Sequence, residues 1–93
     1  MTKISRNKLK PSRTALTIYV GTTLASITII RRKKDSIYCG TGRNEYCSIN
    51  LPYEKDLIEI WVTKTGYRSN HVKIRLDKKE MEIKLPLRNS YVG

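Results

Sequence analysis

The sequence predicts an all-β fold, a small antiparallel β-sandwich of about seven strands that follows a flexible basic N-terminal arm. Three observations support this prediction. Ile, Val, Thr and Tyr recur along the chain, and branched and aromatic side chains pack well in strands. Apolar residues alternate with polar ones, and turn signals interrupt the alternation about every eight to twelve residues. No window keeps its apolar residues at helical spacing for long enough to predict a helix.

The length of 93 residues sets the domain count. Chains of this size form one domain with one modest core. We therefore expect a basic arm over residues 1–14, a sandwich over 15–87 and a tail over 88–93. No apolar run approaches the length needed to cross a membrane.

The arm is predicted from composition. Residues 1–14, "MTKISRNKLKPSRT", contain five bases, one proline and no acid. A segment so poor in large apolar side chains cannot offset the entropy lost on ordering, so we expect it to be flexible.

Three strands are predicted in the first half of the sandwich, over residues 15–21, 24–30 and 36–40. In "ALTIYVG", alternate apolar side chains point to the core, and "GTT" ends the strand as a turn. The second strand, "LASITII", offers four residues to the core: Leu24, Ala25, Ile27 and Ile29. The polar tip "RRKKD" follows, "SIYCG" returns, and "GTGRNE" has the composition of a loop.

Four further strands are predicted over residues 46–51, 57–64, 71–76 and 81–87. Each has an apolar face: Cys47, Ile49 and Leu51; then Ile58, Ile60 and Val62; then Val72, Ile74 and Leu76; then Met81, Ile83 and Leu85. The segments between them, "PYEKD", "TGYRSN" and "DKKE", are predicted turns.

Positive charge is concentrated near the N-terminus. The net charge is +11, and nine bases precede Asp35, the first acid. Five of them form the predicted docking arm: Lys3, Arg6, Lys8, Lys10 and Arg13. Four form a basic loop tip, which solvation alone can also explain: Arg31, Arg32, Lys33 and Lys34. Such a field attracts nucleic acid, anionic lipid or an acidic protein surface.

We predict no catalytic, cofactor-binding or metal-binding residues, and hence no enzyme activity. A zinc site needs about four ligands, whereas Cys39, Cys47 and His71 offer three scattered ones. His71 is expected on a solvated strand face. The two cysteines are either a disulfide across a hairpin or two half-buried thiols.

Two aromatic residues are candidates for an interface. If alternate residues of 57–64 face the core, Trp61 points outward, where tryptophan is enriched at binding surfaces. Tyr19 belongs to the same outward-facing set. The alternative is that the arm or a loop covers this face.

Residues 1–25 also have features of a secretory signal, because a basic start precedes a moderately apolar stretch. Five hydroxyl side chains interrupt that stretch, and cleavage near Ala25 would remove the first predicted strand. Export remains an alternative.

Four short motifs carry a resemblance: "ASITI" (25–29), "TGRNEYCSI" (41–49), "LPY" (51–53) and "KTGY" (64–67). In this order they resemble the carboxypeptidase regulatory-like, or transthyretin-like, family of immunoglobulin-like β-sandwiches. Gly66 would permit a positive φ in the last motif. The chain departs from the pattern at Glu45 and at the charged "EKD". The resemblance implies a non-catalytic accessory domain that supports other domains, cell-envelope proteins or virion proteins.

The leading hypothesis is a structural subunit of a larger assembly. A bacteriophage capsid decoration protein fits best, with the arm docked on an acidic neighbour such as a major capsid protein and the protein located in a virion assembled in the host cytoplasm. One alternative is a small basic nucleic-acid-binding protein, with Tyr19, Tyr38 and Trp61 as stacking candidates. Another is an exported cell-envelope domain. Cytoplasm and envelope are the corresponding locations. No cofactor is expected.

Overall fold

The computed structural model describes residues 13–31, 35–53 and 56–89. Within these ranges the chain forms strands and no helix. In chain order they are β1 (Arg13–Tyr19), β2 (Ser26–Arg31), β3 (Asp35–Gly40), β4 (Tyr46–Pro52), β5 (Ile58–Thr63), β6 (Tyr67–Arg68), β7 (Asn70–Ile74), β8 (Glu80–Lys84) and β9 (Arg88–Asn89).

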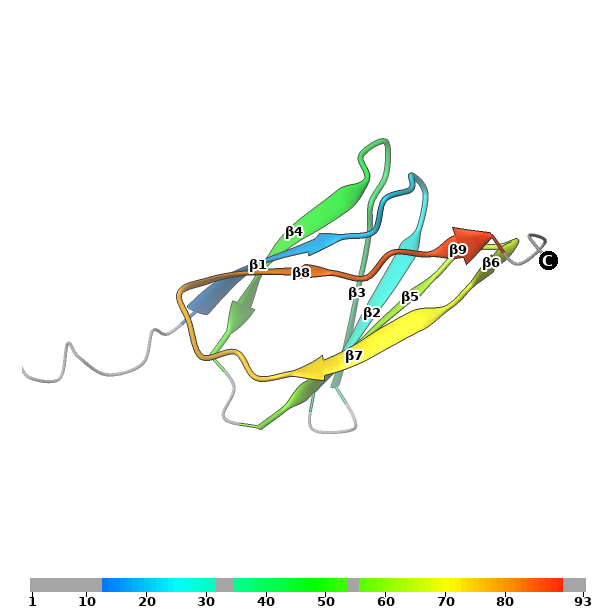
Figure 1. The fold of residues 1–93 in the computed structure, drawn as a ribbon. Coiled ribbons are helices and arrows are strands. Elements are labelled where there is room, and N and C mark those ends of the chain that lie inside the picture. The colour runs from blue at the N-terminus through cyan, green and yellow to red at the C-terminus, as the bar shows by residue number, and fades with distance from the viewer. Residues whose placement is uncertain (1–12, 32–34, 54–55, 90–93) are drawn as a thin grey trace, which may run out of the picture.

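The strands form two facing sheets (Figure 1). The smaller has the order β4-β1-β8 and the larger β3-β2-β5-β7, while β6 and β9 pair by themselves. Seven strands in the described chain are five residues or longer, as the sequence predicts. The predicted all-β sandwich is therefore confirmed.

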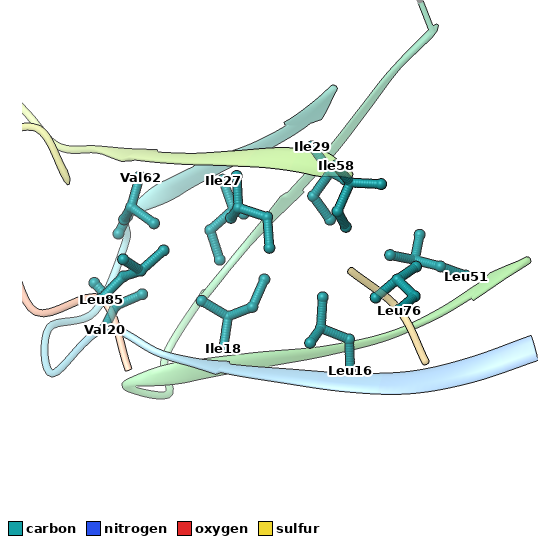
Figure 2. Close-up of a cluster of buried hydrophobic side chains, with 12 residues drawn as sticks. Leu16, Ile18, Val20, Ile27, Ile29, Leu51, Ile58, Val62, Leu76 and Leu85 are labelled. Carbon is teal, nitrogen blue, oxygen red and sulfur yellow. The ribbon is translucent and has the colours of Figure 1, made fainter. Parts of the chain in front are cut away.

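One core fills the space between the sheets. Figure 2 shows Leu16 and Ile18 of β1 pointing toward apolar side chains of the larger sheet, Ile27 among them. Twelve hydrophobic residues of the described ranges are buried: Leu16, Ile18, Val20, Ala25, Ile27, Ile29, Leu51, Ile58, Ile60, Val62, Leu76 and Leu85. Burying one such Leu, Ile or Val side chain contributes about 1.5–3 kcal/mol. The apolar residues that we expected to face the core do so, with one exception.

The exception is Leu24, which we expected in the core. It is 72% exposed and has a φ of 56°. Thr41 fixes the turn around it, because its hydroxyl accepts a hydrogen bond from Ala25 N (3.0 Å) and donates one to Thr22 O (3.1 Å). The turn therefore runs through Leu24, and β2 begins only at Ser26.

The smaller sheet also differs from the purely antiparallel prediction. β4 runs antiparallel to β1, but β8 runs parallel to it, with Ala15 opposite Glu80 and Tyr19 opposite Lys84. β7 and β8 lie in different sheets, so the link between them crosses the sandwich instead of forming a hairpin. Because of this crossing, β8 enters the smaller sheet running in the same direction as β1.

The ends of the sandwich extend beyond the expected range of 15–87. Arg13 begins β1, and the fully buried Thr14 donates from its hydroxyl to Lys78 O at 2.9 Å. These two residues, assigned to the arm from composition, belong to the sheet because β4 pairs with them. β9 likewise includes Arg88 and Asn89 of the expected tail. Residues 1–12 and 90–93 lie outside the described ranges.

Candidate functional site

The outer face of the larger sheet carries a continuous row of side chains. The register aligns Tyr38 of β3 with Thr28 of β2, Thr28 with Trp61 of β5, and Trp61 with His71 of β7. Neighbours in a row lie about 4.7–4.9 Å apart along the hydrogen-bonding direction. We call these four residues the aromatic row.

The rings of the aromatic row are held in different ways. Trp61 and His71 stack with centroids 4.1 Å apart and an interplanar angle of 14°. This cross-strand contact leaves Trp61 half-buried. Tyr38 stands at the edge strand and is 75% exposed. The row therefore combines one ordered stack with one accessible ring.

The next row leads into a hollow. Ile30 of β2 lies opposite Glu59 of β5, and Glu59 lies opposite Lys73 of β7. Beside them is a hollow of about 700 Å³, lined by Ile30, Asp56, Leu57, Ile58, Glu59, Lys73 and Arg75. Its lining mixes exposed Leu57 with two bases and two acids, so it can accept a ligand that has both apolar and charged groups.

The basic loop tip adjoins this part of the sheet. Arg31 ends β2 opposite Asp35, which begins β3, and the two side chains form an ion pair. The Arg31–Asp35 pair is next to the pair of Ile30 with Ser36 in the register of β2 and β3. Arg32, Lys33 and Lys34 complete the tip in sequence and lie outside the described residues.

The structure separates the two predicted interface aromatics. Tyr19 lies on β1, so its outward side chain is on the smaller sheet, where it contacts Tyr46 with ring centroids 5.8 Å apart. Trp61 is on the opposite outer face of the sandwich. Both side chains point away from the core, as predicted, but they lie on opposite faces of the sandwich.

Only one residue of the predicted docking arm is described. Arg13 is exposed at the start of β1, and its guanidinium donates to Asn50 O at 3.4 Å. Lys3, Arg6, Lys8 and Lys10 precede the described ranges.

Sequence reasoning missed His71 as a member of the site, although its outward phase was predicted. The sequence feature that could have identified His71 is its outward orientation, which it shares with Trp61. Whether the two side chains become neighbours depends on the bend between their strands, β5 and β7. Gly66 has the predicted positive φ, 87°, and Tyr67 N donates to Lys64 O at 3.0 Å.

No family model, curated protein or solved structure matches this chain. Over the described ranges, three or more His, Cys, Asp or Glu side chains nowhere gather in a way that could hold a metal ion. No helix long and apolar enough to cross a membrane occurs in the part of the chain that the structure describes.

Proposed function

We propose that this protein is a non-catalytic accessory subunit of a larger assembly and docks on an acidic protein surface through the outer face of its larger sheet. The observation that carries the proposal is the aromatic row, in which Trp61 is half-buried and Tyr38 exposed. Trp, Tyr and Arg are the residues that dominate protein interfaces.

Charge supports the choice of an acidic partner. The chain carries a net charge of +11. The hollow beside the row is balanced, with Lys73 and Arg75 against Asp56 and Glu59, so the positive excess lies elsewhere in the chain, and four bases precede the first described residue. Complementary charge speeds encounter and selects the partner, whereas the aromatic anchors supply most of the affinity.

The assembly we propose is a virion, with the protein as a capsid decoration subunit. This part rests on the resemblance of "LPY" and "KTGY" to accessory sandwich domains. The docking face and the kind of assembly are distinguished by different outcomes of one experiment.

Incorporation into particles tests both parts. Tagged wild type, Trp61→Ala and Tyr19→Ala are supplied in the native source, and particles are purified by density and their content measured by mass spectrometry. We expect Trp61→Ala to lower incorporation about ten-fold or more. Tyr19→Ala, on the opposite face, is the matched control and should incorporate normally. Equal incorporation of all three overturns the docking face, and absence of wild type from particles overturns the virion.

A second candidate function is the binding of single-stranded nucleic acid on the same face. The observation in its favour is that Tyr38, Trp61 and His71 lie in one row next to Lys73 and Arg75. Stacking of bases on aromatic side chains contributes about 1–3 kcal/mol per base.

Trp61 is the one tryptophan, so its fluorescence reports on this candidate directly. Titration with a thymidine oligonucleotide at several salt concentrations should quench Trp61 if bases stack there, and Trp61→Ala should weaken binding. Binding that falls steeply with salt but leaves Trp61 emission unchanged is purely electrostatic and rejects the row as a nucleic-acid site.

A further inference from the structure

Cys39 and Cys47 lie at the edge where the two sheets come together. Cys39 of β3 pairs with Ile27, and Cys47 of β4 pairs with Ile18. Ile18 and Ile27 point into the core from opposite sheets (Figure 2). Both cysteines have the same inward phase and pack against this core. They therefore occupy corresponding positions, one strand farther out, on the edge strands of the two sheets.

The connection between the two cysteines is anchored to both sheets. Thr41 N donates to Ala25 O at 3.1 Å, and Val20 N donates to Glu45 O at 2.8 Å. Gly40 lies so close to Ala25 that a Cβ added at Gly40 would be 3.1 Å from the carbonyl oxygen of Ala25. The backbone thus holds the cysteines in place from both ends of the turn.

The thiols are in contact with each other. Both are free, half-buried cysteines on neighbouring edge strands, β3 and β4, and their thiols interact. Burial raises the pKa of Cys39 to about 12, and the hydrogen bond to Cys47 and the charge of Cys47 raise it as well.

We propose that Cys39 and Cys47 form a reversible disulfide that ties the two sheets together, by exchange with a small-molecule disulfide of the glutathione class. This modification site is independent of the docking face, because both sulfurs point into the sandwich.

The exchange has two balanced steps. The Cys47 thiolate attacks one sulfur of the small disulfide, forms a mixed disulfide and releases the first small thiolate, which takes up a proton. Cys39 then gives its proton to solvent and attacks the sulfur of Cys47, and the second small thiol leaves. The two protein thiols are oxidised to one disulfide, and the small disulfide is reduced to two thiols. Cys39 acts second because burial raises the pKa of its thiol, so it holds its proton more tightly.

The expected consequence is a more stable sandwich. The bond closes a short loop of the unfolded chain, which should raise Tm by roughly 10–20 °C for a domain of this size. The effect should disappear on reduction.

The experiment equilibrates the full chain with glutathione buffers and measures free thiols, intact mass and Tm. We expect a monomer lighter by two hydrogens, with residues 39 and 47 joined in a peptide map. Two thiols that stay free in the native protein under fully oxidised glutathione overturn the proposal, as do adducts or dimers in place of the internal bond.

A register-shifted double variant, Cys47→Ser with Ser48→Cys, is the matched control. Ser48 is exposed and its hydroxyl lies 3.0 Å from that of Thr17, so a thiol there points to the outer face. In the unfolded chain, a disulfide between residues 39 and 48 should form as easily as one between residues 39 and 47. Disulfide formation of both proteins in denaturant verifies this. The folded variant should keep two free thiols, and equal closure when folded would show that the sandwich does not position the cysteines.

Discussion

The two outer faces of the sandwich follow the same alternation but use it differently. On the smaller sheet, outward side chains pair with one another: Thr17 with Ser48 through their hydroxyls at 3.0 Å, and Tyr19 with Tyr46 through their rings. On the larger sheet, the row that holds the Trp61–His71 stack ends beyond Thr28 at Tyr38, which is 75% exposed, and a hollow lies beside this row. The difference teaches that an outward phase alone does not define a binding face. The accessible ring and the adjacent hollow single out the larger sheet.

The largest expected effect is a loss of stability that affects both faces, because the substitution leaves a cavity in the core that they share. Ile60 is fully buried on β5 in the larger sheet. Ile60→Ala should lower the free energy of unfolding by about 2–5 kcal/mol, because a cavity remains where the side chain packed. Urea denaturation measures this loss. Ile30→Ala, on the half-buried outer face of β2, is the control and should cost much less.

The next effect concerns where the smaller sheet begins. Deletion of residues 1–12 should leave stability unchanged, whereas deletion of 1–14 should lower it by about 1–3 kcal/mol. The longer deletion removes the buried Thr14 and its hydrogen bond to Lys78 O. Thermal unfolding of both truncated proteins measures the difference, and equal stabilities would contradict the assignment of Thr14 to β1.

A smaller effect compares the aromatic pair on each face. Double-mutant cycles to alanine should give a coupling energy of about 0.5–1.5 kcal/mol for Trp61 with His71, and a similar one for Tyr19 with Tyr46. Changes at Trp61 and Tyr19 should be additive within about 0.5 kcal/mol, because the core separates them. Coupling between those two residues would mean that the faces do not act independently.

The smallest effect lies at the edge that joins the faces. The pKa of Cys39 is raised to about 12 from an ordinary 9.0, so the reduced native state holds this proton more tightly than the unfolded chain does. Its contribution to stability is complete below about pH 9 and is lost as pH rises toward 12. We expect the stability difference between reduced wild type and Cys39→Ala to shrink over this range. A difference that stays constant with pH would contradict the raised pKa.

Local patterns explain how much of the fold was predictable. Period-two alternation predicted the strands and the phase of residues such as Ile18, Ile60 and Trp61, because side-chain direction in a strand depends only on the residue's own position. Leu24 is out of phase with Ala25, Ile27 and Ile29, and it was wrongly expected in the core because its side chain is apolar. The hydrogen bonds of Thr41, far along the chain, fix its turn instead.

The candidate site depended on contacts that no local pattern encodes. The outward phases of Tyr38, Trp61 and His71 were predictable, but their common row follows from the registers of three strand pairs. For the two cysteines the sequence left two alternatives, a disulfide across a hairpin or two half-buried thiols. They meet between β3 and β4 of different sheets, because the chain changes sheet at the turn between them.

The parallel pairing of β1 with β8 affects the order in which the protein can be completed during translation. Among the described strands β1 is made first, yet β8, its neighbour on one side, is made only after β2 to β7. Until then a nascent chain leaves one border of β1 unpaired, and such borders invite association with other chains. A chaperone that shields this border during synthesis should therefore raise the yield of folded protein.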